Sequence, residues 1–351
     1  MKQITIAGRK VGDGCPVYFI AEAGVNHNGS LELAKKLVDI AAAAGADAVK
    51  FQKRTVSDIL IAEALNRPYT VPTSLGATYG EHREKLELPE NEFIELKQHA
   101  DAAGITMLAS GWDPKSVDFL DDIGIPAFKI ASADCSNLPL LEHIARKGKP
   151  VLLSTGMSEM SEVEEAVATV RRHNDQLVLF QCTSTYPCDN DQINLRVIPT
   201  YREHFQCIVG YSGHERGLAP TEAAVALGAA VVERHFTIDR TMTGPDHAAS
   251  LEPSGLQRLI RNIRNIEKAL GSPEKKIMEA ERGVRDRLAK SIVASRGIPS
   301  GTTITADMLT VKGPGNGLKP SYIPSLVGVV AEQPIAADTL VPREALTWRR
   351  A

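Results

Sequence analysis

The sequence lacks a long apolar run, a signal-like start and a strong net charge, and each absence excludes a class of protein. No stretch of its 351 residues approaches the ~20 apolar residues of a membrane-spanning helix. The N-terminus, MKQITIAGRK, has no apolar signal segment. A net charge of −3 argues against broad binding of nucleic acid. We therefore expect a globular cytoplasmic protein that binds neither membranes nor nucleic acid.

The chain also has few cysteines, and their spacing forms no recognisable pair. The five cysteines are an odd number, and none forms a CxxC pair. Cys182 and Cys188 lack partners at the spacing of zinc ligands. This pattern indicates reduced thiols rather than a disulfide framework or a structural zinc site.

Eight short apolar, β-branched runs recur along the first three quarters of the chain. They are almost continuously apolar, which is typical of parallel strands that are buried on both faces. The runs begin at Val17, Ala46, Ile105, Ala127, Pro150, Leu177, Cys207 and Ala229.

Helical patterns lie between these runs. Ser30 can cap a helix that ends at Gly45, with Leu37 and Ala41 on its apolar face. Eight strand–helix units predict a (β/α)8 barrel. A doubly wound open sheet is the rival, but no Gly-rich dinucleotide motif follows the first run.

The composition changes twice after the eighth unit. We expect the barrel to occupy residues 1–272, a charged and helical linker 273–290, and a small, mostly β domain 291–351. Within that domain, IPSGTTITADML and IAADTLVPREAL form a weak internal repeat. Earlier in the chain, the long segment 53–85 between the second and third strands is expected to be a lid, a binding loop or disordered.

Two lysines stand where a buried strand should contain only apolar residues. Lys50 lies in AVKFQ and Lys129 in AFKIA. A lysine in a buried strand is costly unless it is paired, and in a barrel the functional residues gather at the carboxyl ends of the strands. The lysines therefore predict an anion site for a small phosphorylated or carboxylated substrate.

Two histidines end the seventh and eighth strands. Because neighbouring strands lie about 4.8 Å apart, His214 and His235 could share one divalent metal beside Glu22 and Glu233. A Schiff base on Lys129 is an alternative use of the same strand ends. The alternative without a function is that one or both histidines are core residues whose hydrogen bonds are made within the protein.

Several ordered motifs together resemble the sialic acid synthase family, the N-acetylneuraminate synthases. They include IAEAGVNHNGS, AVKFQK, FKIASADCSNLPLL, VGYSGHE, VVERHFT and GPDHAASLEP. The tail with VKGPGNG is similar to the family's antifreeze-like SAF domain. The resemblance runs from about residue 17 to residue 346.

The resemblance implies an enzyme that condenses phosphoenolpyruvate with N-acetylmannosamine and water, releasing phosphate to give N-acetylneuraminate. It implies a divalent cofactor, manganese or magnesium, and a homodimer in which the SAF domain of one chain caps the other chain's barrel. The alternatives are a 9-phosphate synthase that uses N-acetylmannosamine 6-phosphate, or a legionaminate or pseudaminate synthase. A carbohydrate-binding protein without catalysis is the alternative from another class.

The resemblance also implies roles for individual residues. Glu22 would handle the proton of the attacking water, and His214 and His235 would bind the metal. Phosphoenolpyruvate would be held by Lys50, Gln52, Ser110, Lys129, Ser132, Ser154, Ser184 and Ser212. Asp134, Tyr186, Glu233 and Asp246 would lie near the sugar, with Gln181 as a further candidate.

Two regions depart from bacterial members of the family. Gly313 stands where some members have an arginine that reaches the partner's site, and Lys312 is adjacent. The segments RPYT and TYGEH resemble animal-type enzymes instead. Arg67, His82 or Lys85 on this loop could therefore meet a sugar phosphate.

Overall fold

The structure is a computed structural model that describes residues 2–347. It divides into two compact units, Met1–Gly271 and Ser272–Ala351, and each is described by itself. Residues 348–351, the last of the expected C-terminal domain, lie outside the described residues.

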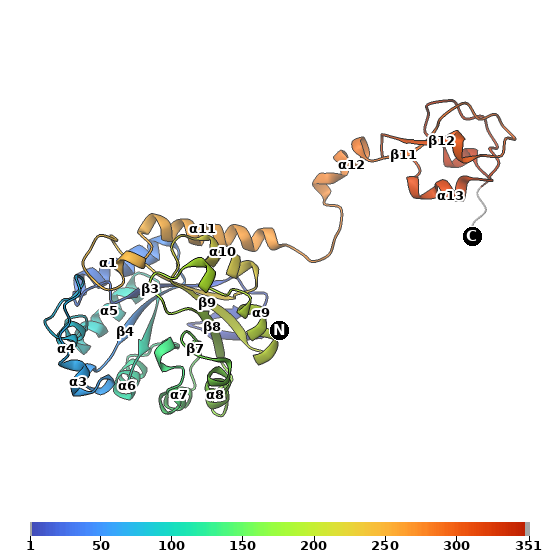
Figure 1. Cartoon of the computed structure of the whole chain (residues 1–351). Helices are drawn as coiled ribbons and strands as arrows, with labels where there is room; N and C mark the ends of the chain where they lie inside the picture. The colour runs from blue at the N-terminus through green and yellow to red at the C-terminus, as the bar shows by residue number, and fades with distance from the viewer. Residues whose placement is uncertain (1, 348–351) are drawn as a thin grey trace. The chain divides into compact units, whose positions relative to one another are not determined.

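The first unit is a closed barrel of eight parallel strands, as the sequence predicts (Figure 1). The ring closes because the last strand pairs with both the seventh and the first. The strands are β3 (Tyr18–Gly24), β4 (Ala48–Lys53), β5 (Thr106–Gly111), β6 (Phe128–Ile130), β7 (Val151–Ser154), β8 (Leu177–Cys182), β9 (Ile208–Gly213) and β10 (Val231–His235).

One long helix follows each strand and packs on the outside of the ring. In α1, the Ser30 hydroxyl accepts the Leu33 N–H at 3.3 Å, and Gly45 ends the helix at φ 80°, as the caps predict. Among the described residues, no helix is long and apolar enough to cross a membrane. The helices are α1 (Leu31–Ala44), α5 (Glu90–Ala102), α6 (Pro114–Asp122), α7 (Leu138–Ala145), α8 (Met160–Arg171), α9 (Val197–Phe205), α10 (Ala219–Ala226) and α11 (Pro253–Leu270).

The barrel interior is layered from apolar to charged along the strand direction. Side chains two residues apart share a face of a strand. Val231, Glu233 and His235 of β10 therefore all face the barrel interior, in this order from its apolar end toward the cavity. Val231 belongs to a buried apolar cluster, whereas Glu233 and His235 reach the cavity at the other end. The apolar layer also contains Ile20, Ala48, Leu108, Ala127, Leu152, Val178, Phe180 and Ile208.

An N-terminal hairpin, which the sequence patterns did not reveal, closes the apolar end of the barrel. Strands β1 (Gln3–Ile6) and β2 (Arg9–Gly12) pair antiparallel. Ile4, Ile6 and Val11 join the apolar interior layer. Because apolar side chains fill this end, the opposite end, where the strands terminate, is the one available to ligands.

The long segment after β4 forms three short helices. These are α2 (Val56–Ile59), α3 (Ala62–Leu65) and α4 (Tyr79–Glu84). The Thr78 hydroxyl caps α4 by accepting the Glu81 N–H at 3.2 Å. Of the three expectations for this segment, a lid or a binding loop therefore fits better than disorder.

The second unit has its own apolar core, which includes Ile292, Ile304 and Leu326. Ile298 and Ile335, which occupy equivalent places in the two repeat copies, form an antiparallel bridge with each other. Lys312 pairs with Asp338 of the same unit. Its elements are η4 (Glu279–Glu281), α12 (Arg282–Leu288), β11 (Ser291–Ala294), η5 (Ala306–Met308), β12 (Leu309–Lys312), η6 (Pro320–Tyr322), α13 (Ile323–Leu326) and η7 (Arg343–Ala345).

A buried ion pair lies between the barrel wall and the surrounding helices. Strand alternation predicts that Arg234 points away from the barrel interior, and it does, but it is buried there. Its Nη1 lies 2.7 Å from Glu215 Oε1 and donates to Thr221 Oγ1 at 2.6 Å. The Tyr211 hydroxyl donates to the other Glu215 oxygen at 2.8 Å. Gly213 has no room for a side chain, since a Cβ there would lie 2.5 Å from Glu215 Oε2.

Removing one partner of this pair should strongly destabilise the barrel. We expect Glu215→Ala to lower the free energy of unfolding by about 3–5 kcal/mol, because it leaves a buried guanidinium without its counter-charge. Urea unfolding of the full chain would measure the change. Arg216→Ala, at the exposed neighbouring position, should change it by less than about 0.5 kcal/mol. Equal effects of the two variants would contradict the assignment.

Candidate active site

A cavity of about 310 Å³ opens at the carboxyl ends of the barrel strands. It is lined by nearly all of the residues that the sequence singled out. These are Glu22, Lys50, Gln52, Ser110, Lys129, Ser132, Ser154, Ser184, Tyr186, Ser212, His214, Glu233, His235 and Asp246.

Asp134, which the resemblance put near the sugar, is the exception. It lies in the short 3-10 helix η1 (Ser132–Asp134), and its Oδ1 accepts the Asn137 amide at 3.0 Å. It is absent from the cavity lining, although Ser132 and Ala133 of the same 3-10 helix line the cavity. Gln181 is also turned away, and its amide donates to the Ile193 carbonyl at 2.8 Å.

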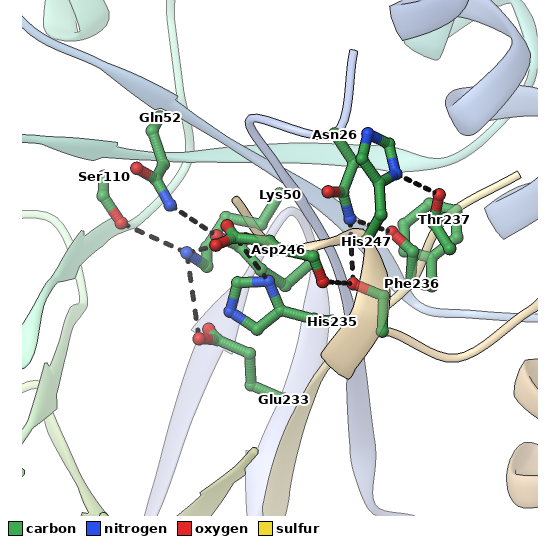
Figure 2. A network of polar contacts seen from close by, with 12 residues as sticks. Asn26, Lys50, Gln52, Ser110, Glu233, His235, Phe236, Thr237, Asp246 and His247 are labelled. Atoms are coloured by element: carbon green, nitrogen blue, oxygen red, sulfur yellow. Dashed lines mark hydrogen bonds and ion pairs between the residues drawn. The ribbon is translucent and has the colours of Figure 1, made fainter. Parts of the chain in front are cut away.

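Two lysines and two glutamates form a buried charged layer at the base of the cavity. Lys50 Nζ lies 2.7 Å from Glu22 Oε2, and Lys129 Nζ lies 3.0 Å from Glu233 Oε1. Lys50 also approaches Glu233 Oε1 at 3.8 Å and donates to Ser110 Oγ at 3.2 Å (Figure 2). Strand register creates this layer, since Glu22 is opposite Lys50 and Ser110 is opposite Lys129. The lysines are therefore paired, as buried lysines must be.

Glu233 is placed between the lysines. Its Oε1 contacts Lys129 and also accepts the Ser212 hydroxyl at 3.3 Å. The resemblance put Glu233 near the sugar, whereas its observed partners are residues that were expected to hold phosphoenolpyruvate. Its second oxygen is buried without a hydrogen-bond partner, which leaves it available to a ligand.

The two glutamates differ in acidity because their surroundings differ. Burial raises the pKa of Glu22, and Lys50 only partly opposes this. Burial would also raise the pKa of Glu233, but Lys129 and Lys50 outweigh it and lower that pKa to about 2. Glu233 is thus a fixed anion, whereas Glu22 can exchange a proton. Carboxylates with separated pKa values are typical of acid–base sites.

A chain of donors fixes the orientation of Glu22. Arg54 Nη2 donates to Gln52 Oε1 at 2.6 Å, so the Gln52 amide nitrogen must face Glu22 Oε1, which it reaches at 3.1 Å. Arg54 is held in turn by Glu87, with Nε 2.6 Å from Oε1. Sequence patterns gave no signal for Arg54, because this role depends on side-chain contacts after the strand end.

Serine hydroxyls line the wall beside Lys129. Ser132 Oγ accepts the Gly156 N–H at 3.0 Å, and a Cβ at Gly156 would lie 2.2 Å from Ser184 Oγ. Gly156 therefore has to be glycine for both hydroxyls to approach. The buried hydroxyl of Ser154 has no hydrogen-bond partner. An unsatisfied buried polar atom costs about 1–3 kcal/mol, which favours a site that a polar ligand completes.

The two histidines meet as their strand positions predict. Their ring centroids are 5.4 Å apart, and the Tyr186 ring lies 4.0 Å from that of His214. His214 Nδ1 lies 2.8 Å from the Thr183 carbonyl, to which it can only donate, so in the neutral ring the lone pair is on Nε2. Burial lowers the pKa of His235 to about 4, so this imidazole is neutral near pH 7.

These donors fit a divalent metal. His235 Nδ1 is buried without a hydrogen-bond partner, and Asp246 Oδ2 lies 3.8 Å from it. Across residues 2–347, no group of three His, Cys, Asp or Glu side chains is close enough to form a complete site. Substrate or water oxygens would have to supply the remaining ligands, which is typical of catalytic rather than structural metal sites.

A polar network positions the loop that carries Asp246 (Figure 2). The Ser250 hydroxyl donates to the Asp246 carbonyl at 2.7 Å. The Asn26 amide donates to Ser250 Oγ at 2.9 Å and to the Phe236 carbonyl at 2.8 Å. These bonds join Asn26 of the NHNG motif to Ser250 of the DHAAS motif. Polar residues of the two motifs that do not belong to the charged layer thus hold the Asp246 loop in place.

The loop after β4 contributes cavity residues that the sequence pointed to only in part. Of its expected phosphate contacts, His82 lines the cavity, but Arg67 and Lys85 do not. Lys85 donates instead to the Leu75 carbonyl at 2.7 Å. Burial lowers the pKa of His82, which keeps it a weak partner for an anion. Residues that went unnoticed in the sequence also line this side: Tyr69, Tyr79, Arg83 and Trp112.

All five cysteines lie within the described residues and are free thiols. Cys182 forms part of the cavity wall, with its Sγ 3.5 Å from Ser132 Oγ. Cys188 instead packs in the apolar layer outside the strands.

Comparisons with known proteins agree with this geometry. Residues 37–275 match the model of the NeuB family, and residues 289–347 match the SAF domain. The chain is 44% identical over 339 residues to N-acetylneuraminate-9-phosphate synthase of Homo sapiens, covering 96% of this chain and 94% of the human protein. It is 40% identical over 326 residues to N,N'-diacetyllegionaminic acid synthase of Campylobacter jejuni, covering 92% and 98%. The crystal structure of the N-acetylneuraminic acid synthetase of Leptospira borgpetersenii superposes with a TM-score of 0.72 at 33% identity, covering 81% of this chain and 95% of that one.

Proposed function

Because this chain belongs to the NeuB family and carries a SAF domain, we propose that it condenses phosphoenolpyruvate with N-acetylmannosamine 6-phosphate. The products would be N-acetylneuraminate 9-phosphate and inorganic phosphate. The observation that carries the reaction is the buried layer of Lys50, Lys129, Glu22 and Glu233 below two histidines. Phosphoenolpyruvate offers a carboxylate and a phosphate to these lysines.

The phosphorylated sugar is preferred because the human relative, named as a 9-phosphate synthase, is 44% identical over nearly the whole chain. The unphosphorylated sugar, which we expected first from the sequence, is the second candidate. It is favoured by the 33% identity to the N-acetylneuraminic acid synthetase of Leptospira borgpetersenii. A legionaminate-type sugar is favoured in the same way by the Campylobacter jejuni relative.

The cavity residues can be assigned separate roles in the proposed reaction. Lys50 and Lys129 would hold the anionic groups of phosphoenolpyruvate, and Ser154 would donate its free hydroxyl. Carbon 3 of phosphoenolpyruvate forms a bond to the sugar aldehyde carbon, and the aldehyde oxygen takes up a proton. Water then adds at carbon 2. The bond from carbon 2 to the phosphate oxygen breaks as the new hydroxyl becomes the carbonyl, and the proton of that hydroxyl passes to the departing phosphate. Glu22, oriented by Gln52 and Lys50, would take the proton of that water.

A divalent cation, manganese or magnesium, would be held by His214 and His235 and would supply Lewis-acid polarisation of the aldehyde. Their strands present both rings to the cavity wall, with Tyr186 packed against them. Asp246 Oδ2 lies 3.8 Å from His235 Nδ1, beyond hydrogen-bond distance. A Schiff base on Lys129 is the weaker alternative, because its Nζ is already engaged by Glu233 Oε1 at 3.0 Å.

We also propose a homodimer in which the SAF domain of each chain caps the other barrel. In support, α12 leaves apolar side chains exposed on the linker, and Val284 and Leu288 are 47% and 60% accessible. Light scattering of the full chain would report the mass of a dimer. A monomer at working concentration would contradict this part of the proposal.

The decisive assay measures phosphate release that depends on phosphoenolpyruvate. The sugars compared should be N-acetylmannosamine, its 6-phosphate, mannose 6-phosphate and the precursors of legionaminate and pseudaminate. We expect the highest kcat/KM with N-acetylmannosamine 6-phosphate. A higher value with an unphosphorylated sugar would overturn the choice of substrate. No release with any sugar would instead favour a carbohydrate-binding protein.

A further inference from the structure

Arg83 is held at the cavity wall by the helix that carries it. It lies in α4, and Tyr79, one turn earlier, is on the same side of that helix. Arg83 Nε donates to the Tyr79 hydroxyl oxygen at 2.9 Å, and Nη2 contacts the same oxygen. The guanidinium carbon lies 5.0 Å from the centre of the Tyr79 ring. Both residues line the cavity, so the pair lies where a bound ligand would meet it.

The charge of Arg83 is not neutralised by the protein. Within residues 2–347, no carboxylate oxygen lies within 4.0 Å of its guanidinium nitrogens, whereas Lys50 and Lys129 at the cavity base are each paired with a glutamate. Nearby Arg54 is paired with Glu87 and does not line the cavity. A half-buried guanidinium without a counter-charge is costly and is typical of a site that an anion completes.

The Arg83–Tyr79 pair offers more than one donor. The Tyr79 oxygen accepts N–H groups from Arg83, so its own hydrogen remains available to a ligand. Within the described residues, Arg83 Nη1 makes no hydrogen bond or ion pair, so its N–H groups remain for a ligand. A guanidinium suits phosphate because its planar donors match two oxygens at once. Glu87 and Asp246 are the carboxylates that face this side at longer range, and Glu87 is already engaged by Arg54.

We propose that Arg83, together with the Tyr79 hydroxyl, binds the phosphate on carbon 6 of the sugar substrate. This inference rests on the proposed function. The lysines at the cavity base account for the anionic groups of phosphoenolpyruvate, and the aldehyde end of the sugar lies toward His214 and His235. The far end of the sugar therefore points away from the charged layer and toward the loop that carries Arg83. The same loop supplies Arg67 and Lys85, but neither lines the cavity.

The test compares kcat/KM for N-acetylmannosamine 6-phosphate and for N-acetylmannosamine in the full-length chain. In Arg83→Gln, we expect the ratio of the two values to fall by about 10- to 100-fold, since a charge-assisted hydrogen bond is lost. Arg83→Lys should recover part of the ratio, because the charge returns without the fork of donors. Lys85→Gln and Arg67→Gln are the matched controls on the same loop, and each should leave the ratio within about twofold of the unmutated protein.

The outcomes separate this inference from the proposed function. If the unmutated protein prefers the phosphorylated sugar and Arg83→Gln keeps that preference, the assignment of Arg83 is wrong and the function stands. If Lys85→Gln or Arg67→Gln lowers the ratio instead, the phosphate lies elsewhere on the loop and the assignment is again wrong. If the unmutated protein shows no preference for the phosphorylated sugar, the proposed substrate itself fails. Turnover of N-acetylmannosamine by each variant reports that it is folded.

Discussion

Replacing Glu22 by glutamine should lower kcat by about 10²- to 10⁴-fold, which is the usual contribution of a positioned general acid or base. The change keeps the shape of the side chain but removes the group that can exchange a proton, and it leaves one acceptor oxygen for the two donors Gln52 Nε2 and Lys50 Nζ. Steady-state phosphate release at saturating substrate would measure it. Glu165→Gln, at an exposed position of α8, should stay within about twofold of the unmutated rate.

The pH dependence gives an independent check of this role. Burial raises the pKa of Glu22, and the carboxylate acts as a base only when it is ionised. The rate should therefore fall as the pH drops through that raised pKa. Glu233, whose pKa is lowered to about 2, should not titrate in the same range. An acid limb that persists unchanged in the E22Q variant would assign it to another group.

Removing the metal, or one of its two imidazole ligands, should lower activity by on the order of a thousandfold or more. Lewis-acid stabilisation contributes several kcal/mol to such reactions, and each 1.36 kcal/mol is a factor of ten. EDTA treatment tests the first case and His235→Ala the second. Activity should return to the treated protein when manganese or magnesium is added. Full activity without bound metal would overturn this role of His214 and His235.

A binding measurement keeps this result separate from a loss of catalysis for other reasons. Titration calorimetry with manganese should show one site in the unmutated chain and at least tenfold weaker binding in His235→Ala, because a first ligand is gone. His173→Ala is a matched control, because His173 is exposed and pairs with Glu142, outside the cavity. Equal manganese affinity in all three proteins would place the metal elsewhere.

The site could be predicted largely because a parallel barrel brings the carboxyl ends of all its strands together at one end of the fold. Once eight parallel strands are expected, Lys50, Lys129, His214 and His235 must face the same end. Register then brings Glu22 opposite both Lys50 and His235. The resemblance supplied the serines, which carry no strong signal of their own since strands often end in hydroxyl residues.

Other features could not be predicted because they depend on contacts between distant parts of the chain. Asp134 does not line the cavity, although Ser132 and Ala133 of the same 3-10 helix do. Arg83 lines the cavity and Lys85 does not, because the cap at Thr78 fixes the start of α4 and so which of its residues face inward. A polar loop of this length gives no periodic pattern from which such a direction could be read.

The charges of VVERHF show what the sequence determined alone and what the tertiary structure decided. Strand alternation by itself places Glu233 and His235 inside the barrel and Arg234 outside, because successive side chains point to opposite faces. The partners of these side chains are not local. Glu233 lies between two lysines from β4 and β6, and Arg234 is buried against Glu215 in the loop after β9. Only closure of the barrel brings these segments within a few ångströms, and that closure fixes which carboxylate stays ionised and which can take a proton.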